Sequence, residues 1–239
     1  MLTDLHDKQY GKDNERLLDR VRAQNPDVIF SVGDMINGDA TDREVERFLA
    51  LLTRLREIAP VYVSYGNQEQ KYLADGRQDL SPRIEQTGAA LLNETCEEID
   101  VAGNHLLIGG TLGHGYLFGR TEEEYEYSPE YRLFTEMQHS ELPTVLLAHL
   151  PDTVIFCRAW ESWQFDLVVS GHTHGGVIRI PGIGGLYAPM QGWFPEYDQG
   201  FFRLGDRTQL IISSGLSGHG WIPRIFNRPE ITVVKIFGS

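Results

Sequence analysis

Short apolar runs that end in glycine or polar residues recur along this chain, and they constrain its fold more than any other feature. "DVIFSVGD" (27–34) and "PVYVSYGN" (60–67) are typical of strands buried on both faces, because each run is almost continuously apolar. Residues 12–24 and 41–58 carry apolar side chains at helical spacing, and Pro26 ends the first of these patterns. The front third therefore predicts a β-α-β-α-β order with a parallel sheet and right-handed crossovers.

The rest of the chain returns to strands after a middle segment of different character. "EEIDVAGNHLLIGG" (97–110) predicts a hairpin with Gly103-Asn104 as its turn. The acidic stretch "GRTEEEYEYSPEYR" (119–132) predicts a solvated loop or helix face. Further strands are expected within "TVLLAHLP" (144–151), "FDLVVSGHTHGG" (165–176), "TQLIISSG" (208–215) and "ITVVKI" (231–236). The length of 239 residues suits one large α/β domain spanning 1–239.

Polar side chains of a few types lie at or just beyond the predicted strand ends. They are Asp4, His6, Asp34, Asn67, His149, His172 and His174. Taken singly, such an aspartate is usually a cap or turn residue, and such a histidine is usually hydrogen-bonded at the surface or in the core. Together they lie where open α/β sheets bind ligands, outside the carboxyl ends of the strands. The set therefore predicts one shared site.

The donor types of this set indicate a metal site. Carboxylate, imidazole and amide groups without a thiolate suit Mn, Fe, Zn or Ni ions. Seven such groups are more than one tetrahedral site needs, so two metals that share a bridging ligand fit better.

The charge balance bears on the ligands of such a site. A net charge of -13 argues against a duplex nucleic-acid partner, because duplex binding depends on Lys and Arg that neutralise phosphates. Two divalent ions would bring four positive charges, and ionised Asp4 and Asp34 would cancel two, leaving about +2. The centre would thus supply the local attraction for phosphate that the composition lacks.

Five motifs carry a family resemblance. "DLH" at 4–6, "GDMING" at 33–38, "GNQE" at 66–69, "AHLP" at 148–151 and "GHTHGG" at 171–176 resemble the ordered motifs of the calcineurin-like metallophosphoesterases. The tail "SSGLSGHGWIPRIFNRPEITVVKI" further resembles a bacterial branch of membrane-associated or secreted phosphoesterases related to lipid-nucleotide pyrophosphatases. The resemblance implies a four-layer α/β/β/α sandwich that hydrolyses a phosphodiester or pyrophosphate bond, with a small phosphorylated substrate that is lipid-linked or a nucleotide.

The resemblance also implies roles for the seven residues. Carried over by position, one metal is held by Asp4, His6 and His174, and the other by Asn67, His149 and His172. Asp34 bridges the two metals, and a shared water or hydroxide is the nucleophile. Two-metal chemistry of this kind needs no protein nucleophile, and Mn²⁺ is the ion we expect first.

Gln68 departs from the family pattern, in which a histidine follows the metal-binding asparagine. A glutamine amide donates a hydrogen bond but delivers no proton near neutral pH, whereas a positioned general acid contributes ~10²–10⁴-fold. Three interpretations stay open: an enzyme adapted to activated leaving groups, an impaired module that binds metals and a phosphorylated ligand, or an enzyme in which His114 or His219 replaces the acid.

Other features concern the substrate side. "YAPMQGWFPEY" (187–197) and "GWIPRIF" (220–226) predict a wall for an acyl chain or base, a peripheral membrane contact, or simply a cover for the sheet edge. Arg179, Arg224 and Arg228 are candidates for contact with a second phosphate. A second "GNH" triplet, at 103–105, lies at the predicted hairpin tip, and we expect no function there.

The sequence carries no membrane-targeting signal that we recognise. No run of about 18 apolar residues occurs, and the start "TDLHDKQYGKDNER" is polar, unlike a signal peptide. We therefore expect neither a transmembrane segment nor a signal peptide within the given chain. Cytoplasmic and envelope-associated locations in a bacterium both stay open, as does an anchor before Met1.

Overall fold

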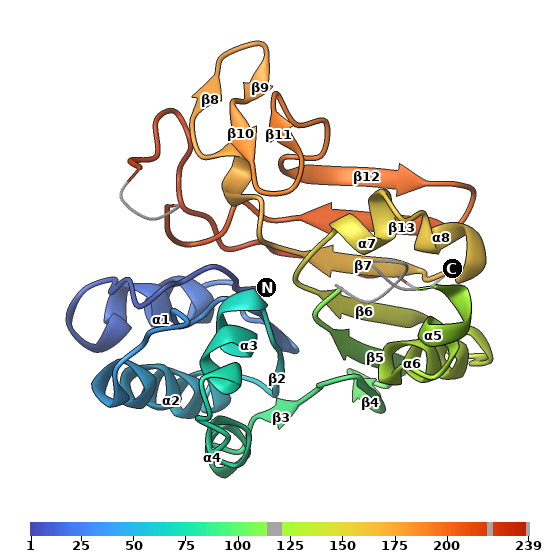
Figure 1. Cartoon of the computed structure of the whole chain (residues 1–239). Coiled ribbons are helices and arrows are strands. Elements are labelled where there is room, and N and C mark those ends of the chain that lie inside the picture. Colours follow the sequence, from blue (N-terminus) through green and yellow to red (C-terminus); the bar gives the residue numbers. More distant parts are fainter. Residues whose placement is uncertain (114–120, 219–221, 238–239) are drawn as a thin grey trace.

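The structure is a computed structural model that describes residues 1–113, 121–218 and 222–237. Two sheets pack face to face, and helices cover the outer side of each (Figure 1). This arrangement confirms the predicted four-layer α/β/β/α class. No described helix combines the length and apolar character needed to cross a bilayer.

The first sheet is formed by three parallel strands from the front of the chain, in the order β1-β2-β3. Its strands are β1 (Ile29–Val32), β2 (Val61–Ser64) and β3 (Ala90–Leu91). Leu2 adds an isolated parallel bridge to Ser31 on the free side of β1. The helical elements of this half are η1 (Lys12–Asn14), α1 (Glu15–Arg22), α2 (Asp42–Arg56), α3 (Asn67–Ala74) and α4 (Leu80–Gln86). The predicted parallel pairing of the strands within 27–34 and 60–67 is confirmed, whereas the first strand of the predicted β-α-β-α-β order is only the isolated bridge at Leu2.

The second sheet has six strands in the order β12-β13-β7-β6-β5-β4. Its four central strands are parallel, and β4 and β12 pair antiparallel at the edges. Its strands are β4 (Thr95–Val101), β5 (Asn104–Thr111), β6 (Thr144–Ala148), β7 (Leu167–Ser170), β12 (Gly200–Leu204) and β13 (Thr208–Ile212). The helices of this half are α5 (Glu122–Glu126), α6 (Pro129–Gln138), α7 (Asp152–Ile155) and α8 (Ala159–Ser162).

Between β7 and β12 the chain forms two small antiparallel hairpins that project from the sandwich, at the top of Figure 1. The short helix η2 (His174–Gly176) leads into them. Their strands are β8 (Arg179–Ile180), β9 (Gly184–Gly185), β10 (Tyr187–Ala188) and β11 (Gly192–Trp193).

Successive side chains of a strand point to opposite faces of the sheet, and in the central strands both sets are apolar. In β6, Val145 and Leu147 point into the apolar cluster that joins the two sheets, whereas Leu146 packs in the cluster beneath the outer helices. Because both faces are covered, the strand reads as a continuous apolar run, as the sequence indicated. The sandwich therefore has three apolar layers, and its strand ends are left to carry polar residues.

Two strand predictions were wrong in detail. Val101 pairs with Asn104, so the hairpin turn is Ala102-Gly103, one residue earlier than predicted. Both turn residues have positive φ, 54° and 82°, as a two-residue type I′ turn requires. "ITVVKI" (231–236) is not a sheet strand: among the described residues it exchanges backbone hydrogen bonds with Met1 alone, through Thr232. High β-propensity forms a strand only where a partner strand runs alongside.

Candidate metal centre

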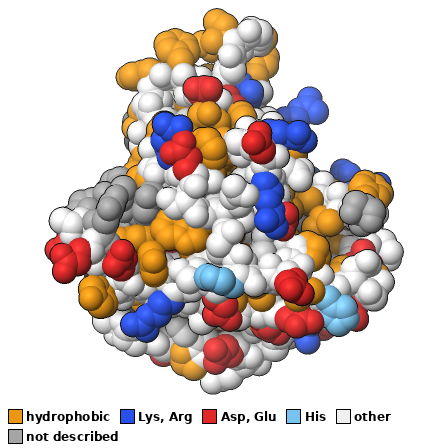
Figure 2. All heavy atoms as spheres, turned by 90° about the vertical axis from the view of Figure 1, so that its right-hand side faces the viewer, with side chains coloured by type: hydrophobic (Ala, Val, Ile, Leu, Met, Phe, Trp, Pro, Cys, Tyr) orange, Lys and Arg blue, Asp and Glu red, His pale blue; other side chains and the backbone are white. Residues whose placement is uncertain are grey.

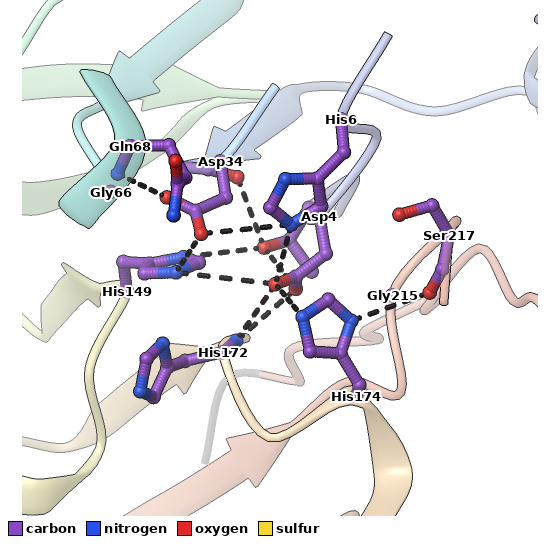
Figure 3. Close-up of polar contacts among 12 residues, drawn as sticks. Asp4, His6, Asp34, Gly66, Gln68, His149, His172, His174, Gly215 and Ser217 are labelled. Atoms are coloured by element: carbon purple, nitrogen blue, oxygen red, sulfur yellow. Dashed lines mark hydrogen bonds and ion pairs between the residues drawn. The ribbon is translucent and has the colours of Figure 1, made fainter. Parts of the chain in front are cut away.

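The loops that follow β1, β2, β6 and β7 meet at one end of the sandwich, beside the segment that holds Asp4 and His6 (Figure 3). Backbone bonds fix that segment against the end of β1. The Asp4 amide donates to the carbonyl of Gly33 at 3.1 Å, and the His6 amide donates to the carbonyl of Asp34 at 3.1 Å. The strand ends therefore converge as the sequence predicted.

Asp4, His6 and His174 form one group of candidate ligands. Each offers one ligand atom, and these atoms all lie within 4.8 Å of one another. Asp4 Oδ1 lies 3.9 Å from His6 Nε2 and 3.6 Å from His174 Nε2. One divalent ion could be held by all three residues.

Asp34, His149 and His172 form a second group of the same kind. Asp34 Oδ2 lies 3.3 Å from His149 Nε2, and the rings of His149 and His172 lie 5.4 Å apart. Asn67 is the first residue of α3. Its Oδ1 is buried and has no hydrogen-bond partner among the described residues.

Asp34 faces both groups. Besides its approach to His149, its Oδ2 lies 3.7 Å from His6 Nε2, which belongs to the first group. In Figure 3 the carboxylates of Asp4 and Asp34 lie in the middle of the cluster, with the histidines around them. This is the position that a bridging carboxylate would need.

Several atoms that would meet a metal make no hydrogen bond, which tests the fit of the residues to divalent ions. Among the buried side-chain atoms that make no hydrogen bond in the described parts of the chain, four belong to predicted ligands: His6 Nε2, Asn67 Oδ1, His149 Nε2 and His172 Nε2. Buried polar atoms are almost always hydrogen-bonded. Four such atoms at one place, all of ligand type, fit a centre built for cations.

The other ring nitrogen of three histidines is held by oxygen. Nδ1 of His6 lies 2.9 Å from Asn37 Oδ1, Nδ1 of His149 lies 2.8 Å from the Val32 carbonyl, and Nδ1 of His174 lies 3.3 Å from the Ser217 carbonyl. An Nδ1–H that donates to oxygen leaves the Nε2 lone pair free, which is the usual support for a metal-binding histidine.

Charge interactions within the centre are strong. Burial disfavours the charged ring of His149, but the Asp34 carboxylate outweighs it and raises the pKa of His149 to about 10. Burial, reinforced by the charge on His149, lowers the pKa of His172 to about 3. Burial also opposes the charge on Asp34, yet His149 holds the pKa of Asp34 well below its usual range. Because ligands bind metal deprotonated, a bound cation would favour the neutral ring of His149.

The backbone at the centre is unusual. Five of the seven predicted ligands have positive φ, which is uncommon for residues other than glycine. They are Asp4 (53°), His6 (46°), Asp34 (53°), His172 (68°) and His174 (50°). Such conformations cluster at functional sites, where surrounding contacts hold them.

Close packing explains the glycines of "GD" and "GN". A Cβ at Gly66 would lie 2.2 Å from Asp34 Oδ1, and one at Gly33 would lie 2.8 Å from Cγ of His149. Any side chain at either position would therefore collide with a candidate ligand.

Glu69 is a residue that the sequence analysis missed. Its buried carboxylate accepts backbone hydrogen bonds from Asp34 (2.8 Å), Met35 (2.7 Å), Ile36 (3.2 Å) and Gly66 (2.8 Å). It thereby ties the loop after β1 to the loop after β2. Burial and the nearby Asp34 raise the pKa of Glu69. The signal available in the sequence was an acidic residue two positions after a predicted ligand.

Gln68 lies beside Asp34 (Figure 3). Its backbone N–H donates to Asp34 Oδ1 at 2.8 Å, and its side-chain Oε1 accepts from the Gly38 amide at 2.9 Å. The side chain is therefore fixed at the edge of the centre, and its catalytic role stays a prediction.

Arg224, a candidate for substrate contact, is occupied within the chain. Its guanidinium donates five hydrogen bonds, to the carbonyls of Ser214, Gly215, Ser217 and Asn227 and to the Asn227 side chain. Five is the full number of its donors. In this conformation Arg224 holds the loop whose Ser217 carbonyl faces His174, and a phosphate contact through Arg224 stays a prediction.

The remaining substrate-side candidates are spread out. Arg179 pairs with Asp198 at 2.8 Å and donates to the Gly175 carbonyl at 3.0 Å. His114 and His219 lie outside the described residues. His105, of the second "GNH" triplet, is exposed on the β4–β5 hairpin and belongs to neither ligand group, with its Nδ1 2.8 Å from Glu98 Oε1.

A cavity of about 870 Å³ opens beside the centre. It is lined by His6, Lys8, Asn37, Ser217, Gly218, Ile222, Pro223, Arg224, Phe226, Asn227, Arg228 and Pro229. These described residues include three cations and no carboxylate. A phosphorylated molecule at the centre would thus extend into a cavity with a positive and partly apolar lining.

Comparisons with known proteins bear on the family and the fold of the chain. Residues 1–176 match the family model of the calcineurin-like phosphoesterases. The chain is 29% identical over 243 residues to an uncharacterized metallophosphoesterase of Campylobacter jejuni, covering 100% of this chain and 59% of that protein. It is 27% identical over 213 residues to phosphodiesterase YaeI of Escherichia coli, covering 89% and 71%. The chain therefore spans little more than half of the Campylobacter relative.

A solved structure supports the fold alone. The sulfate thiohydrolase SoxB of Thermus thermophilus aligns with a TM-score of 0.51 at 12% identity, covering 83% of this chain and 36% of that one.

Proposed function

Because the chain belongs to the calcineurin-like phosphoesterase family, we propose that it hydrolyses a phosphodiester or pyrophosphate bond with two divalent metal ions. The observation that carries the proposal is the place of Asp34 Oδ2, which lies 3.3 Å from His149 Nε2 and 3.7 Å from His6 Nε2. One carboxylate is thus within reach of both ligand groups, as a shared centre requires.

Each ligand group would hold one ion. Asp4, His6 and His174 would bind the first, Asn67, His149 and His172 would bind the second, and Asp34 would bind both. Such ions polarise a water molecule and the phosphoryl group, and they offset charge on the phosphoryl oxygens. We propose Mn²⁺ as the first ion to test.

The protein's own part is to hold these side chains and to meet the rest of the substrate. Oxygen acceptors on Nδ1 orient three of the histidines, and the Glu69 carboxylate fixes the loop that carries Asp34. Lys8 and Arg228 line the adjacent cavity and place positive charge where a second anionic group of the substrate would lie. Neither needs to take part in bond cleavage.

Gln68 limits the leaving groups that the enzyme would handle. Its amide can donate a hydrogen bond to a leaving oxygen, but it supplies no proton near neutral pH. We therefore propose that good substrates have leaving groups that need little protonation, such as phosphate in a pyrophosphate or an aryl oxide.

The alternative is a module that binds metals and a phosphorylated ligand without turnover. The specific observation in its favour is the same residue: Gln68 is anchored through Oε1 to the Gly38 amide and has no acidic proton. Both hypotheses share the metal ligands and differ only in whether bound substrate is cleaved.

Hydrolysis of bis-p-nitrophenyl phosphate by metal-stripped protein reloaded with Mn²⁺ tests the proposal, with metal counted on the same sample. Two ions per chain and turnover support the enzyme, and two ions without turnover support the binding module. Fewer than two ions would contradict the ligand assignment itself.

Gln68→His then separates an adapted enzyme from a disabled one. With an alkyl phosphodiester, whose leaving group needs a proton, restored acid catalysis should raise the rate by ~10²–10⁴-fold. Gln70→His is the matched control, because Gln70 is an exposed residue of the same helix. No gain in Gln68→His alongside good wild-type activity would show that the enzyme works without this acid.

A further inference from the structure

The two projecting hairpins carry large apolar side chains that are exposed to solvent. Ile183, Trp193 and Phe194 are 68%, 69% and 59% exposed, and Tyr187 and Met190 are also exposed. Figure 2 shows apolar side chains gathered at the projecting end of the molecule. We call the exposed apolar residues of this end the hairpin surface: Ile183, Tyr187, Met190, Trp193, Phe194 and Phe226.

Phe226 connects the hairpin surface to the metal centre. The Arg179 amide donates to the Ile225 carbonyl at 2.9 Å, so the segment with Phe226 lies against β8. Phe226 borders a cavity of about 490 Å³ that is lined otherwise by residues 179–184 of the β8–β9 hairpin. It also lines the cavity of about 870 Å³ beside His6. Apolar surface thus continues from the hairpin tips to the candidate site.

Charge distinguishes this end from the rest of the molecule. The chain has 34 acidic residues, yet residues 167–195 contain none; the carboxylates that follow are Glu196, which is exposed, and Asp198, which pairs with Arg179. The cavity of about 870 Å³ that Phe226 borders is lined by three cations, Lys8, Arg224 and Arg228, and by no carboxylate among the described residues. An acidic protein is repelled by an anionic surface, unless the side that approaches it carries more cations than carboxylates, as this end does.

We propose that the hairpin surface docks on a lipid bilayer that contains anionic lipids. Exposed Trp and Tyr beside aliphatic tips suit the boundary between headgroups and acyl chains. Two narrow projecting hairpins can enter that boundary, whereas a protein partner usually meets a broader face. Docking would bring the cavity beside His6 to the level of the headgroups, so that a phosphate carried by an amphiphile could reach it. The proposal does not depend on hydrolysis.

Cosedimentation of the purified chain with vesicles tests this proposal. Vesicles of phosphatidylcholine with phosphatidylglycerol should bind the chain, vesicles of phosphatidylcholine alone should bind it more weakly, and added salt should reduce the difference. The triple variant Ile183→Ser, Trp193→Ser, Phe194→Ser should bind roughly 100-fold more weakly. Tyr127→Ser is the matched control, because Tyr127 is 74% exposed and lies between α5 and α6.

Several results would overturn the proposal. Wild-type protein that stays in the supernatant with both kinds of vesicle, or a triple variant that binds as well as wild type, excludes bilayer docking. A dimer in solution that the triple variant abolishes would make a second copy the occupant instead. Hydrolysis of bis-p-nitrophenyl phosphate without vesicles should be unchanged in the triple variant, which separates lost docking from lost activity.

Discussion

Glu69→Gln is the perturbation that most directly tests how the centre is held together. In the wild type, Glu69 Oε2 accepts from the amides of Asp34 and Gly66, and Oε1 accepts from those of Met35 and Ile36. A glutamine keeps the size of the side chain but turns one oxygen into an NH₂ donor. Whichever way the amide is oriented, two buried backbone N–H groups then face a donor.

The expected loss of stability follows from those two groups. A buried N–H left without a partner costs about 1–3 kcal/mol, which gives about 2–6 kcal/mol for two. The substitution also removes a carboxylate whose burial is itself unfavourable, so we expect the lower part of this range, about 2–4 kcal/mol. At a slope of about 3 kcal/mol per M, the midpoint of urea unfolding should fall by about 1 M.

Urea unfolding of metal-stripped protein, followed by tryptophan fluorescence, measures this effect without a contribution from lost metal. Glu46→Gln is the control: Glu46 is exposed and pairs with Arg83 at 2.7 Å, and loss of such a surface pair costs at most about 1 kcal/mol. A Glu69→Gln midpoint equal to that of wild type would refute the reasoning that this carboxylate clamps the two loops.

Three further predictions concern other parts of the chain. Burial and nearby Glu130 raise the pKa of Glu94 from 4.5 to about 7, so the folded state holds this proton more tightly and stability falls as pH rises from 4.5 to about 7. Glu94→Gln should remove that fall and should be up to about 3 kcal/mol more stable than wild type near pH 8. Urea unfolding measured across this pH range should show the difference, and parallel pH profiles for wild type and variant would contradict the prediction. Arg224→Lys loses donors that hold the loop facing His174, and metal titration should show about tenfold weaker binding. His105→Ala should leave the metal content unchanged, and a lost ion would place this histidine in the centre.

Much of the fold could be predicted because its signals are local. Apolar runs marked the central strands, and Thr41 forms the capping box that begins α2. The segment "ITVVKI" has the same local signal as a strand, but only the assembled structure shows that, among the described residues, its backbone hydrogen-bonds with Met1 alone. The hairpin turn lies one residue earlier than predicted for a similar reason, because the pairing register of the whole hairpin decides which residues form the turn.

The candidate site, like the fold, could be predicted from the sequence only in part. The types and order of the seven candidate ligands are visible in the sequence, and the structure brings six of them into two groups, although their metal roles stay predictions. Glu69 escaped notice because its partners are backbone amides, which every residue has. Arg224 suggested a phosphate contact because no sequence signal shows that the carbonyls of residues 214–217 turn toward it.

Asp4 and His172 lie side by side at the centre although they are 168 positions apart in the chain, and the His172 amide donates to the Asp4 carboxylate. An ion held from both parts would act as a cross-link that closes a loop of that length. The entropy lost in closing so long a loop is large and must be met before the contact forms. Metal binding would therefore report on completed assembly: a chain whose two sheets had not yet come together would have only half a centre to offer.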